Sequence, residues 1–173
     1  MMHTEEQLKK IIGRITTYLD IHSVTGGFRK VALIGLITHY KSFNCYAQTK
    51  IPRFKNQINF LQHYTKDYQM IKAWEDKYFI AEKSQINKIN NLLERFTNPT
   101  KIKDGERRLG LILGYPECCV NAYCEYTTKF QKNLIIPFMP CSSQCRMQNL
   151  WIDEYKRLAN LYNVNISEKY FQE

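Results

Sequence analysis

Five of the six cysteines lie in two short motifs near the C-terminal end of the 173-residue chain. The first motif, GYPECCVNAYC, spans residues 114–124 and contains the adjacent pair Cys118 and Cys119. The second, PCSSQC, spans residues 140–145 and contains Cys141 and Cys145 in a Cys-x3-Cys arrangement. Thiolates bind zinc and iron–sulfur clusters and also carry out redox chemistry. These four cysteines are therefore the strongest candidates for chemistry.

Both motifs are predicted to lie at the starts of helices. Pro116 suits the first position of a helix that runs to about residue 129, because its missing N–H is not needed there. Ser142 or Ser143 would cap the last helix, with Cys141 just before it and Cys145 in its first turn. The free N–H groups and the dipole of a helix start stabilise a thiolate, which lowers the pKa of the cysteine.

Three interpretations of the cysteines remain open. In the first, one or both of Cys118 and Cys119 join Cys141 and Cys145 around zinc or an iron–sulfur cluster. Adjacent cysteines rarely point into one tetrahedral site, so a set of three thiolates is also considered. In the second, the thiols perform metal-free redox or sulfur-transfer chemistry. In the third, they are small buried apolar residues. The clustering at helix starts favours the metal.

The other two cysteines are interpreted as packing or surface thiols. Cys124 lies about 140° around the predicted helix from Cys119, so it cannot easily share a face with that residue. Cys45 is predicted on a strand. Arg107 and Arg108 precede the first motif and are weaker candidates for holding an anionic substrate. No hydrolase, zinc-protease or phosphate-loop motif is present, so the sequence does not indicate whether the protein is an enzyme.

The charge distribution supports an alternative function. The chain carries a net charge of +9, and the segment 21–73 contains eight basic residues and a single acid, Asp67. Such a segment attracts RNA, DNA or another polyanion, and Tyr46, Phe54 and Tyr64 could stack on bases. A solvated basic face would account for the same residues. The candidate contacts are Arg29, Lys30, Lys50, Arg53 and Lys55. In this alternative the cysteines are structural.

The residue pattern predicts an α+β fold in one domain, residues 1–173. Residues 1–100 form a basic α/β half with short strands or a hairpin, and residues 101–173 form a helical half that carries the cysteine motifs. In the first half the pattern predicts helices at 5–21, 28–35, 54–64 and 84–97, a strand at 37–47 and a hairpin at 69–82. For the apolar stretch Phe28–Leu36, a short helix is favoured over a strand. A further helix is predicted from Glu106 to Gly114.

Composition limits the class of protein. The apolar fraction of 44% is ordinary for a globular chain. No apolar run approaches the roughly 18–20 residues of a membrane span. The N-terminal sequence MMHTEEQLKK does not resemble a signal peptide, so a cytoplasmic location is expected. In that compartment cysteines are more often thiols or metal ligands than disulfides.

The two cysteine motifs together suggest a family. LGYPECCVNAY, followed by PCSSQC and a helix, resembles the archaeal-type proteins grouped as domain-of-unknown-function family 483. The family pattern of Gly-x-Pro-x-Cys-Cys and Pro-Cys-Ser-x-x-Cys matches this chain over roughly its last 65 residues. The resemblance implies a prokaryotic, mainly archaeal type of cytoplasmic protein whose cysteines form one site. It implies no activity or substrate.

Overall fold

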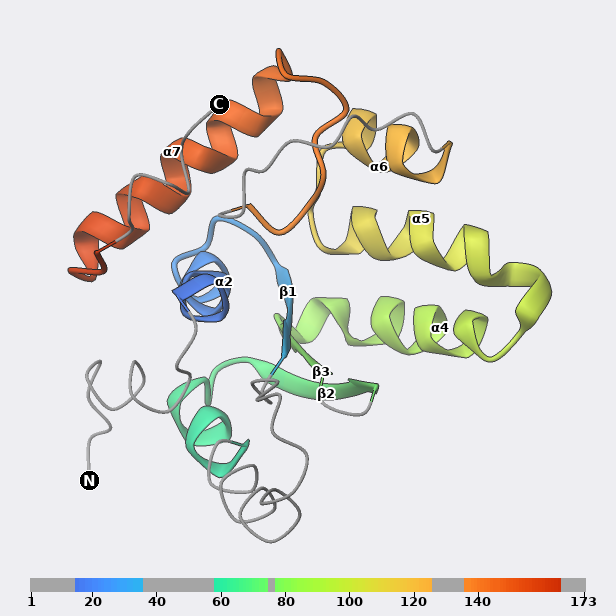
Figure 1. Ribbon diagram of the computed structural model, residues 1–173. Coiled ribbons are helices and arrows are strands. Elements are labelled where there is room, and N and C mark those ends of the chain that lie inside the picture. Colours follow the sequence, from blue (N-terminus) through green and yellow to red (C-terminus); the bar gives the residue numbers. More distant parts are fainter. Residues whose placement is uncertain (1–14, 36–57, 75–76, 126–135, 166–173) are drawn as a thin grey trace, which may run out of the picture.

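In the computed structural model, residues 15–35, 58–74, 77–125 and 136–165 can be described. They form an α+β fold in which a small antiparallel sheet lies between helices (Figure 1). The first part contains α2 (Ile15–Thr25), β1 (Val31–Gly35), a helix at residues 58–64, β2 (Gln69–Trp74) and β3 (Lys77–Ala81). The second part contains α4 (Ile86–Phe96), α5 (Ile102–Ile112), α6 (Glu117–Cys124) and α7 (Arg146–Leu161). Short 3-10 turns at Lys83–Gln85 and Pro99–Lys101 precede α4 and α5.

The sheet has the order β1-β3-β2, and both of its strand pairs are antiparallel. Strands β2 and β3 form the hairpin that the sequence predicted, with Met70 opposite Ile80. Strand β1 pairs with the other edge of β3, so that Leu33 lies opposite Phe79. The sheet therefore joins segments from the start and the middle of the chain.

Strand β1 corrects the prediction of a short helix between residues 28 and 35. Its side chains alternate between two hydrophobic cores: Ala32 and Ile34 pack in the core with α2 and α7, and Val31 packs in the core with α4. A strand with both faces buried is apolar at every position, and periodicity alone cannot distinguish such a run from a buried helix.

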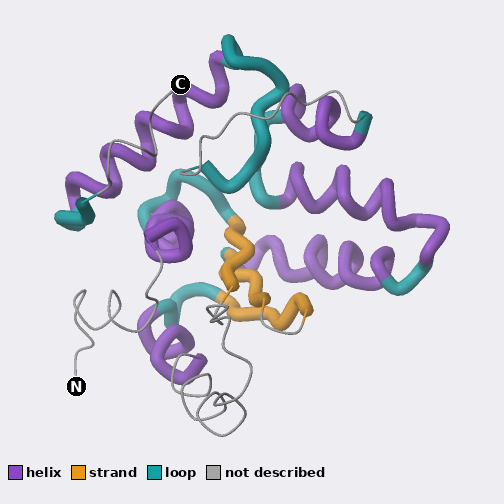
Figure 2. The backbone as a smooth tube through the Cα atoms, viewed as in Figure 1, coloured by secondary structure: helices purple, strands orange, loops and turns teal. Residues whose placement is uncertain are grey.

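Two helical layers enclose the sheet (Figure 2). Helix α2 contacts both β1 and α7, and α4 packs against α5, which in turn packs against α6. Helix α2 continues to Thr25, past the predicted end at residue 21, and stops at the predicted break at Gly26 and Gly27. Gly27 has a φ of 78°, the left-handed conformation that glycine adopts without strain. This turn directs the chain into β1.

The helices of the second half begin at different residues from those predicted. Helix α5 starts at Ile102 rather than at Glu106, and Pro116 is the residue before α6 rather than its first member. Helix α7 starts at Arg146, so neither Ser142 nor Ser143 caps it, and Cys145 occupies the capping position. The predicted strand at 37–47 and the start of the predicted helix at 5–21 lie outside the described residues.

Among the described residues, no helix is both long enough and apolar enough to cross a membrane.

Candidate metal centre

Helix α6 and the segment that precedes α7 bring the four motif cysteines together. Figure 1 shows this segment running beside α6 before it turns into α7. The Sγ atoms of Cys118, Cys119, Cys141 and Cys145 all lie within 4.8 Å of one another. The prediction that the two motifs form a single cluster is confirmed.

The adjacent pair contributes both of its thiols, so the alternative of only three converging thiols is not what the structure shows. The Sγ atoms of Cys118 and Cys119 are 3.8 Å apart, and both approach Cys145, at 3.9 Å and 3.5 Å. Cys119 faces the interior and Cys118 the solvent. The segment carrying Cys141 and Cys145 crosses the start of α6, where the side chains of Cys118 and Cys119 can both reach this segment.

The environment of the cluster is asymmetric. Burial raises the pKa of Cys119, and it also raises the pKa of the more exposed Cys118. Burial acts on Cys145 in the same direction, but the backbone N–H of Gln148 and the neighbouring thiols outweigh it and lower the pKa of Cys145. The N–H of Gln148 belongs to the first turn of α7, so the expectation that a helix start lowers the pKa of a cysteine holds for Cys145. It is wrong for Cys118 and Cys119, because burial raises the pKa of both.

One described thiol lies outside the cluster. Cys124 is buried at the far end of α6 and is not a member of the group. Cys45 lies outside the described residues. All five described cysteines are free thiols, so no disulfide links them.

The two arginines before the first motif have partners of their own. Arg107 donates a hydrogen bond to the Asn121 side chain on α6 at 2.6 Å. Arg108 forms an ion pair with Asp104 one turn earlier on α5, at 2.9 Å. Both side chains are thus engaged on helix surfaces, and their predicted role in holding an anion stays a prediction.

The basic segment 21–73 is only partly described, and Arg29 departs from its predicted role. Arg29 is buried, forms an ion pair with Asp20, and lies over the ring of Trp151. Its guanidinium is therefore not available to a nucleic acid. Lys30 is exposed and lies 3.9 Å from Glu82, while Lys50, Arg53 and Lys55 are outside the described residues.

The buried ion pair is the polar group that sequence reasoning missed. The Tyr155 hydroxyl donates to Asp20 at 2.5 Å, and the Ser23 hydroxyl accepts from Arg29 at 2.6 Å. Burial raises the pKa of Tyr155 well above its usual value. The network joins α2, the turn before β1 and α7. The acidic residue at position 20 was the sequence signal that could have indicated this pair, since a buried arginine requires a counterion.

No family model matches the chain, and no curated protein or solved structure is significantly similar to it. The resemblance to domain-of-unknown-function family 483 accordingly stays a prediction.

Proposed function

We propose that this chain is a metal-binding protein in which Cys118, Cys119, Cys141 and Cys145 hold a single tetrahedral ion, zinc or iron. The observation that supports the proposal is the mutual approach of all four Sγ atoms to within 4.8 Å. Packing alone is a weaker explanation, because Cys118 is exposed and does not belong to the core.

The distances favour one ion over an iron–sulfur cluster. Four thiolates at metal–sulfur bonds of about 2.3 Å occupy the corners of a tetrahedron whose edges are about 3.8 Å long. Three of the six edges are 3.5, 3.8 and 3.9 Å long, close to this value, and all six lie within 4.8 Å. In an iron–sulfur cluster the thiolates bind different irons, so their sulfur atoms are held farther apart.

The ligand number favours a structural role. Four cysteines complete a tetrahedral site, whereas catalytic zinc sites keep one position open for water or substrate. The site connects α6 to the start of α7, elements whose cysteines Cys119 and Cys145 are 26 residues apart in the sequence. The free energy of metal binding would therefore stabilise the packing of the C-terminal half.

Metal analysis tests the proposal directly. Protein purified without oxygen is expected to contain one equivalent of zinc or iron, and the Cys141→Ser/Cys145→Ser variant is expected to contain none. Cys124→Ala is the matched control, because Cys124 is a buried cysteine of α6 outside the cluster. Replacing the native ion with Co²⁺ should produce the intense visible absorption of a tetrahedral thiolate site.

Three results would count against a single structural ion. Acid-labile sulfide together with several irons per chain would indicate a cluster and redox or sulfur chemistry. A metal-free protein as stable as its double-serine variant would indicate packing thiols. A thiol that reacts with disulfide substrates without metal would indicate redox chemistry.

Nucleic-acid binding by the basic segment remains the alternative proposal, supported by the excess of lysine and arginine in residues 21–73. It would rest on Lys30, Lys50, Arg53 and Lys55 without Arg29. An affinity for RNA that falls steeply with salt and survives Cys141→Ser would favour it. A cytoplasmic location, also a proposal, would be consistent with either function.

A further inference from the structure

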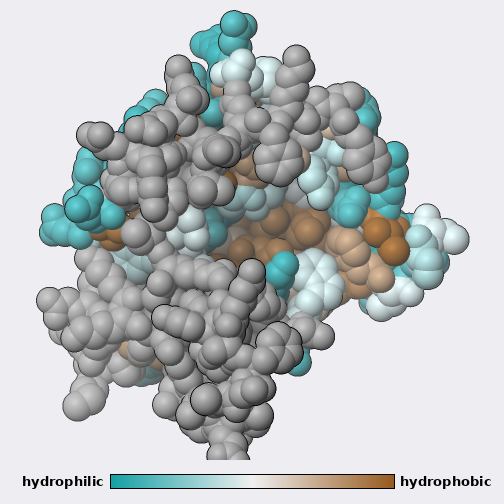
Figure 3. Space-filling view, in the orientation of Figure 1, coloured by the Kyte–Doolittle hydropathy of each residue, from teal (hydrophilic) through white to brown (hydrophobic). Residues whose placement is uncertain are grey.

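A second site lies between the sheet and the helices α5 and α6. It is a cavity of about 730 Å³ whose walls include Leu33 of β1, Leu113 after α5 and Val120 of α6. Figure 3 shows a hollow with an apolar floor on this face of the molecule. The volume is within the range of small-molecule sites, which extends from about 300 to 1,000 Å³.

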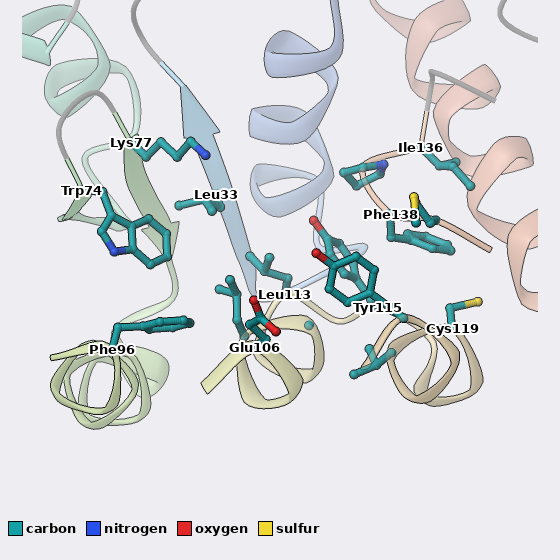
Figure 4. Close-up of a pocket in the computed structure, with 16 residues that line it drawn as sticks. Leu33, Trp74, Lys77, Phe96, Glu106, Leu113, Tyr115, Cys119, Ile136 and Phe138 are labelled. Carbon is teal, nitrogen blue, oxygen red and sulfur yellow. The ribbon is translucent and has the colours of Figure 1, made fainter. Parts of the chain in front are cut away.

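The cavity is walled by aromatic rings on two sides (Figure 4). Trp74 of β2 and Phe96 of α4 form one wall, with ring centroids 5.3 Å apart. Tyr115 and Phe138 form the other, with centroids 5.2 Å apart. Within each pair the two rings contact each other, so both walls are already assembled. A flat ligand between them would find π surfaces on either side.

The cavity also contains two opposite charges for which the described residues provide no partner. Glu106 of α5 is half-buried, and within the described part of the chain its carboxylate has no hydrogen-bond or ion-pair partner. The neighbouring arginines do not neutralise it, because Arg107 binds Asn121 and Arg108 binds Asp104. Lys77 enters from β3, on the side of the cavity opposite Glu106 (Figure 4), and is exposed.

A carboxylate inside an aromatic cavity selects a particular partner. It accepts hydrogen bonds only, and it can accept two parallel ones from adjacent N–H groups. A charge that is partly removed from water is stabilised by such donors and otherwise costs free energy. The exposed ammonium of Lys77 favours a negative group at the outer end of the same ligand.

We propose that this cavity binds a guanine nucleotide. The base would lie between the aromatic walls. The Glu106 carboxylate would accept hydrogen bonds from the two adjacent N–H groups on the Watson–Crick edge of guanine. The phosphate would lie beside Lys77. Stacking of one base on an aromatic side chain is worth about 1–3 kcal/mol. An organic cation would fit the rings and Glu106 but would be repelled by Lys77.

The cavity and the candidate metal centre are separate sites that share one residue. Cys119 belongs both to the cavity lining and to the thiol cluster. Phe138 and Met139, from the segment that leads to Cys141, also line the cavity. Nucleotide binding requires the assembled walls and places no demand on which ion, if any, the cysteines hold. The two proposals can therefore fail independently.

Calorimetric titration of the purified full-length protein with GMP tests the proposal. GMP is expected to bind and AMP to bind about tenfold to a hundredfold more weakly, because adenine lacks the pair of adjacent donors. Glu106→Gln should weaken GMP binding by a similar factor. Glu94→Gln is its matched control, since Glu94 is an exposed glutamate of α4 outside the cavity.

A second pair of variants tests the contact between Lys77 and the phosphate. Lys77→Met should weaken GMP binding while leaving that of guanosine unchanged, and Lys83→Met, an exposed lysine outside the cavity, should alter neither. GMP should also quench the fluorescence of Trp74, and Trp74→Phe should remove most of the quenching. Circular dichroism of each variant verifies that the fold is retained.

Several outcomes would overturn the proposal. Equal affinity for GMP and AMP, or full binding by a folded Glu106→Gln protein, would remove the role of the carboxylate. Binding of a quaternary ammonium ion in place of GMP would identify a cation site. Binding of a guanine-containing RNA oligonucleotide without binding of GMP would assign the cavity to a polymer rather than to a free nucleotide.

Discussion

The Sγ atoms of Cys119 and Cys145 lie 3.5 Å apart although the two residues are separated by 26 positions in the chain. Cys119 is on α6, and Cys145 immediately precedes α7. Both side chains are buried. The segment that leads to Cys145 also carries Phe138, which lines the aromatic cavity. The cluster and the cavity wall are consequently parts of one local arrangement.

Metal removal should destabilise the protein reversibly. A strong chelator is expected to lower the free energy of unfolding by about 4 kcal/mol, because losing a structural ion is among the most costly single changes. Added zinc should restore it. Thermal unfolding with and without chelator measures the effect. The Cys141→Ser/Cys145→Ser variant should be insensitive to chelator, and an equal chelator response in this variant would contradict the prediction.

Acidification should release the metal. Burial raises the pKa of Cys118 and Cys119, so these thiols hold their protons more tightly than ordinary cysteines, and protons compete with the ion for the sulfur atoms. Affinity is therefore greatest at high pH and falls as the pH decreases. Transfer of zinc to a colorimetric chelator, followed from about pH 8 to pH 5, should increase steadily. Retention that is independent of pH would exclude thiolate ligands.

Gly110 allows α5 and α6 to approach closely. A Cβ atom at this position would lie 2.7 Å from Cγ2 of Val120. Gly110→Ala should therefore cost about 1–3 kcal/mol of stability, as overpacking does in other cores. Denaturant unfolding would measure the loss. Combining Gly110→Ala with Val120→Ala should restore part of the lost stability. Gly35→Ala is the control, since no atom of the described residues lies within 4 Å of the added methyl group.

Breaking the buried pair between Asp20 and Arg29 should be costly. Asp20→Asn leaves the Arg29 guanidinium buried without a counterion, and such changes cost about 3–5 kcal/mol. Urea denaturation at neutral pH measures the loss. The combined variant Asp20→Leu/Arg29→Met should be more stable than Asp20→Asn alone, because no unpaired charge remains. Arg157→Met, which breaks an exposed pair with Glu154, should have almost no effect.

Local patterns in the sequence determined several features of the protein. The turn at Gly26 and Gly27 ends α2, and the β-prone runs around residues 75–77 produce the hairpin. The apolar spacing of residues 86–96 and 146–161 produces α4 and α7. The two cysteine motifs indicated a single cluster. The turn, the hairpin and the two helices depend on residues close together in the chain, where turn chemistry and helical or strand periodicity act directly.

Only the tertiary structure decided the rest, because it depends on distant neighbours. Residues 31–35 became a strand when β3 supplied its hydrogen bonds and cores formed on both faces. Arg29, which the charge pattern placed on a basic surface, is buried because Asp20 and Tyr155 are brought beside it. Cys118 and Cys119 both reach the cluster because of the path that the chain takes over the start of α6. The aromatic cavity combines side chains from six described helices and strands, and no local pattern could have revealed it.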